Sequence, residues 1–86
     1  MIQAKLERLS DAKPGERFRI IKIAIEGTMK RRLLDLGFVP GNEVLVLQKS
    51  PLGDPTAYRV SHTTIALRNE ESSNIYGERM RNEQQS

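Results

Sequence analysis

The side chains that could hold a metal ion in this chain are few and lie in predicted turns. Its 86 residues include one histidine, His62, and no cysteine. The carboxylates that could join it are Asp54, Glu70 and Glu71, and together with imidazole they form a hard to borderline ligand set that suits a ferrous ion. None of them recurs at the spacing of a preformed metal site. We therefore predict no resident cofactor and, at most, weak binding of Fe²⁺ or another divalent ion.

Each of these four residues also fits a purely structural role. His62 lies in a short polar segment between two predicted strands, where a turn residue needs no ligand. Glu70 and Glu71 follow a predicted strand, and carboxylates favour the first turn of a helix because of its positive dipole end. Asp54 lies in a Pro-Leu-Gly-Asp-Pro turn, where an aspartate can bond to its own backbone. The metal and structural interpretations both stay open at these positions.

The chain contains no recognisable catalytic constellation. It has no GxxxxGK phosphate-binding loop, no GxSxG nucleophile elbow and no pair of histidines at helical spacing. Without cysteine it also lacks thiolate nucleophiles, thiolate metal cages and disulfides. We therefore predict a protein that is not an enzyme.

One run of cations, Lys30, Arg31 and Arg32, could neutralise phosphates. The formal net charge of the chain is only +3, however, which is modest for a dedicated nucleic-acid binder. No row of accessible aromatic residues accompanies the run, because Phe18 and Phe38 are predicted core residues. These features argue against nucleic acid and favour a protein-facing or solvated surface.

The sequence predicts no direct insertion into a membrane. Its longest uninterrupted apolar stretch is the four residues 44–47, whereas a membrane-spanning helix needs ~20. The opening segment MIQAKLERL also lacks the apolar region of a secretory signal. We expect a cytoplasmic protein that reaches the inner face of the membrane only through recruitment by a partner.

Short β segments must position most of these residues. The apolar alternation changes phase between Ile20 and Ile21, which predicts a bulge in the first strand. Turns are predicted where Pro and Gly cluster, at residues 14–15, 40–41 and 51–55. The predicted strands cover residues 16–25, 43–50, 56–61 and 64–68, with a weaker fifth strand at 75–76.

Residues 28–36 form the one predicted helix. Thr28 is the expected N-cap, and Gly37 marks the expected end. At ~100° per residue, Lys30 and Leu34 share a mixed flank. The residues expected to face the core are Met29, Leu33 and Leu36.

The fold class that follows is mainly β: a small SH3-like barrel of about five strands with one α-helix at about 28–36 inserted after the first strand. Closing the sheet on itself is how a short β chain removes its exposed edges. Residues 1–77 are expected to form a single domain. Residues 78–86 are expected to be a flexible tail, because they contain one apolar residue, Met80.

The order of motifs in this chain resembles the FeoA family of bacterial ferrous iron transport accessory proteins. The matching segments are LSDAKPGE, GTMKRRLLDLGFVPG, PLGDP and TIALRNEE, and the resemblance covers residues 6–76. It implies an SH3-like barrel related to the C-terminal domain of iron-dependent repressors. It also implies action beside the FeoB permease, a membrane protein with a cytosolic GTPase domain. Many relatives carry a glycine near Ser61 and His62, where this chain has none.

The sequence motifs and the resemblance to the FeoA family together predict a non-enzymatic accessory module of ferrous iron uptake. We expect it to bind and modulate the cytosolic GTPase part of FeoB. Two other functions stay open: an SH3-like nucleic-acid or repressor-associated module, and a small transition-metal sensor using His62, Glu70 and Glu71. A weak homo-oligomer also stays open. The predicted partner-binding residues are Lys30, Arg31, Leu34, Pro51, Leu52, Gly53, Asp54 and Pro55.

Overall fold

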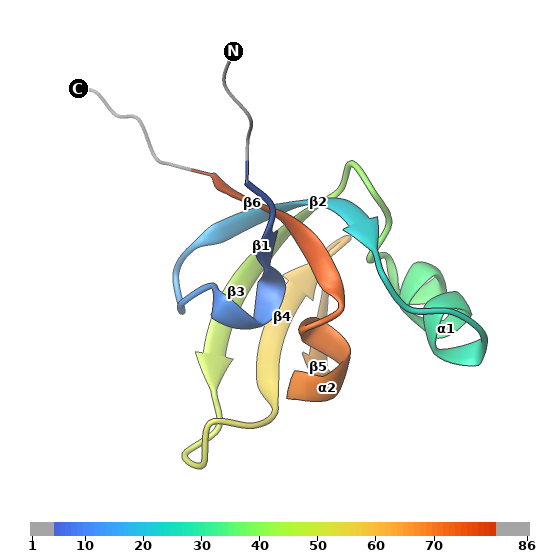
Figure 1. Cartoon of the computed structure of the whole chain (residues 1–86). Helices are drawn as coiled ribbons and strands as arrows, with labels where there is room; N and C mark the ends of the chain where they lie inside the picture. Colours follow the sequence, from blue (N-terminus) through green and yellow to red (C-terminus); the bar gives the residue numbers. More distant parts are fainter. Residues whose placement is uncertain (1–4, 81–86) are drawn as a thin grey trace.

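The chain folds into one curled antiparallel sheet with helices at its side (Figure 1). The computed structural model describes residues 5–80. The strand order across the sheet is β1-β6-β2-β3-β4-β5. The elements in chain order are β1 (Glu7–Arg8), a 3-10 turn (Leu9–Asp11), β2 (Arg17–Ile23), α1 (Thr28–Leu36), β3 (Glu43–Lys49), β4 (Thr56–Val60), β5 (Thr63–Leu67), α2 (Asn69–Ser72) and β6 (Ile75–Met80).

β2 bends sharply along its length and pairs with two neighbours. It pairs with β3 only at its start, but with β6 along its whole length. The register with β6 shifts between Ile20 and Lys22, so the predicted bulge is confirmed. Because a bulge bends a strand and increases its twist, it allows β2 to leave β3 while still following β6.

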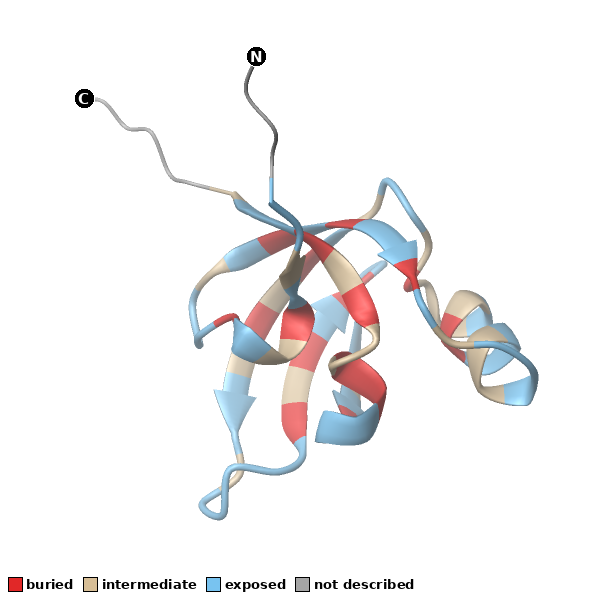
Figure 2. Ribbon diagram, in the orientation of Figure 1, coloured by how far each residue is buried: buried red, intermediate tan, exposed pale blue. Residues whose placement is uncertain are grey.

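The inner side of the curled sheet encloses one hydrophobic core (Figure 2). Phe18 and Phe38 are fully buried, as predicted, and the ring of Phe38 meets that of Tyr58 edge to face at 6.4 Å between centroids. This geometry suits the quadrupoles of two aromatic rings. The other buried apolar residues are Leu9, Ala12, Ile20, Ile23, Leu33, Val44, Val46, Val60, Leu67 and Ile75.

β6 lies close against β2 at Gly77. A Cβ atom placed there would lie 1.9 Å from the carbonyl oxygen of Arg19 and 2.8 Å from Cε1 of Phe18. No side chain fits that space, so glycine is what allows the backbone of β6 to lie against the bend of β2.

The sheet has six strands instead of the predicted five, because β1 was not predicted. This two-residue strand pairs with Tyr76 and Gly77 of β6. Its sequence, Glu-Arg, carries no apolar alternation. Pairing with a strand about 70 residues away, not local pattern, therefore defines it.

The predicted start of the flexible tail, residue 78, lies within β6. Residues 78–80 belong to β6 and pair with β2, so the prediction was wrong for these three residues. The guanidinium of Arg79 donates to Glu7 at 2.9 Å and to Glu16 at 3.4 Å. Strand pairing and these ion pairs replace the apolar burial that the segment lacks. The rest of the predicted tail, 81–86, lies outside the described residues.

α1 has the predicted bounds, with one correction at its start. It ends at Gly37, which has φ 109° and donates its N–H to the carbonyls of Leu33 and Leu34. This left-handed cap is the conformation that glycine adopts most easily. The N-cap is Gly27, whereas Thr28 was predicted, because Thr28 already lies inside the helix.

The turn between β4 and β5 has a backbone conformation that glycine adopts more easily than the residues present. Ser61 and His62 both have positive φ values, 51° and 65°. Two successive left-handed residues make the mirror-image turn that suits the twist of a hairpin, and glycine or asparagine usually supplies them. This chain forms the turn without either residue.

Candidate partner-binding site

α2 is a single helical turn that the sequence pattern does not predict as a separate helix. The Oε1 atom of Glu71 accepts the backbone N–H of Arg68 at 3.0 Å, and the N–H of Glu71 donates back to the carbonyl of Arg68 at 2.8 Å. This reciprocal pair closes the first turn as a capping box does. The structural role predicted for Glu70 and Glu71, carboxylates in the first turn of a helix, is confirmed.

The PLGDP loop (residues 51–55) is tied to α2 by Asp54. Its Oδ1 atom accepts the backbone N–H of Asn69, the first residue of α2, at 2.8 Å. The backbone N–H of Asp54 also donates to Oγ of Ser50 at 3.0 Å. The sequence predicted that the Asp54 side chain bonds to its own turn. In the structure it bonds to α2 instead. Both bonds brace the loop, and Leu52 protrudes from it with 93% of its surface exposed.

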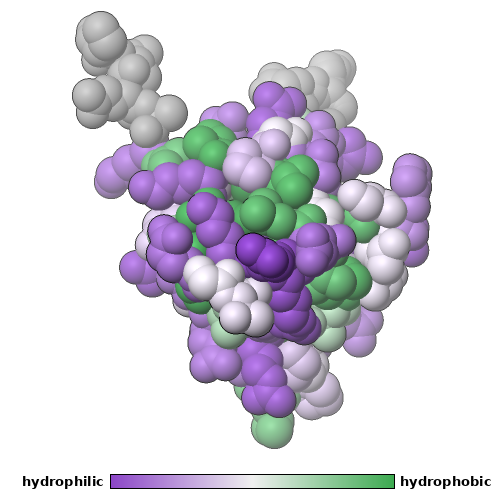
Figure 3. All heavy atoms as spheres, turned by 90° about the vertical axis from the view of Figure 1, so that its right-hand side faces the viewer, coloured by the Kyte–Doolittle hydropathy of each residue, from purple (hydrophilic) through white to green (hydrophobic). Residues whose placement is uncertain are grey.

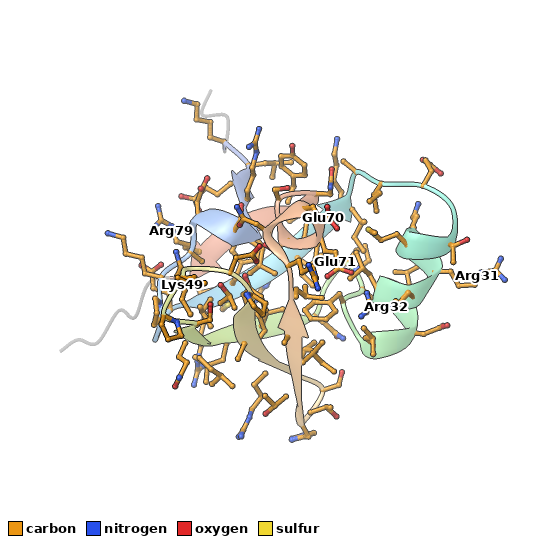
Figure 4. The ribbon with its side chains drawn as sticks, turned by 90° about the horizontal axis from the view of Figure 1, so that it is seen from below. Arg31, Arg32, Lys49, Glu70, Glu71 and Arg79 are labelled. Atoms are coloured by element: carbon orange, nitrogen blue, oxygen red, sulfur yellow. The ribbon has the colours of Figure 1, made fainter. Side chains whose placement is uncertain are left out.

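α2 is tied to α1 by an ion pair. Nη1 of Arg32 donates to Oε2 of Glu71, and in Figure 4 Arg32 points from α1 toward Glu71. The Glu71 side chain is 8% exposed and that of Arg32 is 52% exposed, so the pair is shielded from solvent on one side only. One carboxylate thus closes α2 with one oxygen and holds α1 with the other.

Removing the charge of Glu71 should loosen α1. We expect Glu71→Gln to lower the unfolding free energy by ~1 kcal/mol, because glutamine keeps an acceptor for Arg68 but loses the charge that holds Arg32. Urea unfolding measures the loss, and hydrogen exchange should show faster exchange in α1. Glu70→Gln is the matched control, since Glu70 is exposed. Equal effects of the two substitutions would contradict a special role for Glu71.

Tyr58 lies under α2 as part of the structural support. Burial raises the pKa of its hydroxyl, the charge of Asp54 raises it further, and hydrogen bonding with Ser72 and Thr56 opposes the shift. The phenol therefore stays neutral at physiological pH. Its role is to pack and to bond, not to act as a nucleophile.

The exposed flank of α1 presents the helix residues predicted to bind a partner. Arg31 is exposed and points away from the sheet in Figure 4. Lys30 and Leu34 are half-buried, and Leu34 packs against the edge of the core, which confirms its predicted partial burial. Seen from the side of α1, apolar atoms form separate patches between hydrophilic ones (Figure 3).

α2 lies between the loop and α1 and bonds to both (Figure 1). We call these three linked elements, with Lys30, Arg31 and Leu34 on α1, the α1–α2–loop face. Its organising residues, Arg32 and Glu71, are not among the predicted partner-binding residues. The spacing of Arg68 and Glu71, with a glutamate three residues after a strand end, is the signal that could have predicted α2.

The structure does not bring the predicted metal ligands together. His62 lies in the turn between β4 and β5. Glu70 and Glu71 lie beyond the other end of β5, in α2. Within the described range, residues 5–80, no three side chains of the types His, Asp or Glu form a group that could hold a metal ion. Glu71 is also engaged by Arg32 and Arg68. The arrangement of these residues does not fit a metal site.

The curled six-stranded sheet and the α1–α2–loop face define a small β domain. Residues 7–79 match the FeoA domain model, and the chain belongs to the FeoA family, whose members are non-enzymatic accessory domains of ferrous iron transport. The predicted family and the predicted absence of enzymatic function agree with this assignment.

Solved structures confirm the fold. The FeoA-like protein from Clostridium acetobutylicum has a TM-score of 0.85 and 27% identity, covering 98% of both chains. The zinc complex of FeoA from Stenotrophomonas maltophilia, described as an SH3 domain protein, has a TM-score of 0.74 and 29% identity over 84% of this chain and 89% of that one. A manganese-dependent transcriptional repressor, at 14% identity over 91% of this chain and 43% of its own, shares the fold with a TM-score of 0.81. The SH3-like prediction is confirmed, and the predicted relation to metal-dependent repressors is confirmed as a similarity of fold.

A curated relative joins two proteins in one chain. It is the Fe(2+) transport protein A/Fe(2+) transporter FeoB fusion protein of Porphyromonas gingivalis (strain ATCC BAA-308 / W83). Identity is 35% over 68 residues, which are 79% of this chain. The chain spans only 8% of the length of that relative. In residues 5–80, no helix combines the length and the apolar character needed to cross a bilayer.

Proposed function

We propose that this FeoA-type accessory protein docks on the cytosolic GTPase part of a FeoB-type permease and modulates ferrous iron uptake. The observation that carries the proposal is the fusion relative, in which an A part and a FeoB part share one chain. Covalent linkage of two parts raises their effective concentration, which is useful when they act on each other. The protein would then work in the cytoplasm, at the inner face of the membrane, by recruitment.

The α1–α2–loop face supports this role because it combines an apolar anchor with cations. Leu52 offers nearly its whole side chain, and the bonds of Asp54 hold its loop in place before binding. A preorganised anchor loses less entropy on association. Lys30 and Arg31 can steer an acidic partner surface toward the face.

A Leu52→Asp variant should weaken association with the cytosolic GTPase domain of the permease at least tenfold, about 1.4 kcal/mol, and keep its fold. The reason is that Leu52 makes almost no contact within the monomer. Isothermal titration with the purified GTPase domain measures the effect. Leu6→Asp is the matched control, because Leu6 is an exposed leucine outside this face.

The contribution of α1 to the face is tested by replacing Lys30 and Arg31 with glutamate, which reverses both charges. Leu34 is unsuitable for charge substitution, since it packs against the core. We expect the double variant to bind more slowly and to lose the salt dependence of association. Wild-type binding by both the loop and the helix variants would refute docking through this face.

A further inference from the structure

Two arginines on the outer face of the sheet lie in one row with a leucine between them. Arg17 of β2 is in register with Leu45 of β3, and Leu45 is in register with Arg59 of β4. Both arginines are exposed and Leu45 is half-exposed, whereas their neighbours along each strand point into the core. The row therefore presents a cation, an apolar side chain and a second cation to solvent.

These two arginines differ from the ones that serve the fold. Arg19, Arg32 and Arg79 each form an ion pair with a carboxylate. Within residues 5–80, no ion pair or side-chain hydrogen bond involves Arg17 or Arg59. Their guanidinium groups keep their full capacity to bind a carboxylate through two parallel hydrogen bonds.

A shallow groove of about 450 Å³ follows this row. Arg17 and Arg59 line it together with Leu45, and Glu43, Val44, Ser61 and His62 complete the lining. The left-handed turn at Ser61 and His62 thus contributes to the groove. The groove belongs to the outer face of β2, β3 and β4 and shares no lining residue with the α1–α2–loop face.

We propose that this groove binds an extended acidic segment of a partner protein, in which two carboxylates flank an apolar residue. Neighbouring strands lie ~4.8 Å apart, so the Cα atoms of Arg17 and Arg59 are separated by ~10 Å. In an extended peptide, residues i and i+4 on one face are ~13 Å apart, a span that two splayed arginine side chains can meet. Residue i+2 then lies over Leu45.

The lining favours such a peptide over a polyanion. Glu43 places a negative charge in the groove, which repels a continuous row of phosphates. Nucleic-acid grooves combine many cations with aromatic platforms, and this lining has no Phe, Tyr or Trp. The inference is independent of the proposed docking on FeoB.

The probe for this groove is a fluorescein-labelled peptide, Gly-Asp-Thr-Leu-Thr-Asp-Gly, titrated with the full chain at low salt. We expect saturable binding with a Kd below about 1 mM, and at least a tenfold loss in the Arg17→Gln/Arg59→Gln variant. The control Arg8→Gln/Lys49→Gln removes the same charge at two exposed positions outside both the groove and the α1–α2–loop face, and it should bind like the wild type. Replacing both aspartates of the peptide by asparagine should abolish binding.

Chemical-shift mapping with the same peptide locates the contact. The largest amide shifts should fall at Arg17, Leu45 and Arg59, and circular dichroism should show that the variants stay folded. Absence of saturable binding, an equal loss in the control variant, or shifts confined to α1 and Leu52 would each overturn the proposal. Displacement of the peptide by a single-stranded oligonucleotide at lower concentration would also overturn it, in favour of nucleic acid.

Discussion

A Gly77→Ala variant is expected to lose at least ~3 kcal/mol of unfolding free energy, the upper range for overpacking. The added Cβ would lie 1.9 Å from the carbonyl oxygen of Arg19, which is part of the backbone and cannot rotate away. β6 would have to separate from β2 at the point where the sheet bends. A domain of this size is stable by roughly 4 to 13 kcal/mol, so such a loss removes between about a quarter and three quarters of its stability.

Urea unfolding followed by circular dichroism measures this loss. Gly53→Ala is the matched control, because a Cβ there meets nothing within 4 Å and only the positive φ opposes it. Its expected cost is ~1 to 2 kcal/mol, from backbone strain alone. If Gly77→Ala costs no more than this control, the close approach of β6 to β2 is not required for stability.

Leu33→Ala should cost ~2 to 5 kcal/mol, the usual range for a leucine removed from a packed core. Leu33 is the one fully buried side chain of α1, so it fastens the helix to the sheet. Beyond this contact, the helix is held mainly by half-buried apolar residues and by the ion pair of Arg32. The variant should therefore lose order in α1 before the sheet unfolds.

Leu34→Ala serves as the control for this prediction, since Leu34 is half-buried on the same helix. Its cost should be at least ~1 kcal/mol smaller, in proportion to the apolar area removed. Thermal unfolding gives both values, and hydrogen exchange shows whether α1 opens first. A change below ~0.5 kcal/mol in Leu33→Ala would mean that α1 contributes little to the core.

Elements with a strong local pattern were predictable from the sequence. The bounds of α1 match the prediction because apolar spacing and Gly37 act within a few residues of one another. The bulge in β2 was likewise visible as a change of phase. β1 and residues 78–80 were not predictable, because pairing with distant strands and the bonds of Arg79 to Glu7 and Glu16 hold them in place.

The candidate site was predictable as two segments but not as one surface. The cationic helix flank and the PLGDP loop each carried a recognisable sequence pattern. The resemblance to the FeoA family then led to the prediction that both bind a partner. What joins them is Glu71, which lies 39 residues from Arg32, and Asp54, which lies 15 residues from Asn69. Contacts across such separations leave no periodicity in a single sequence, so α2 became visible as their junction only in three dimensions.

The place of β6 in the sheet has a consequence for synthesis of the chain. β6 is the last of these six strands to leave the ribosome, yet it lies between β1 and β2, the first two of them. Until it arrives, strands β2 to β5 can form a meander, but β2 keeps an open edge and β1 has no partner. Such a nascent sheet can pair with other chains. The final closure brings Glu7 beside Gly77, so folding has to wait for nearly the whole domain to be made.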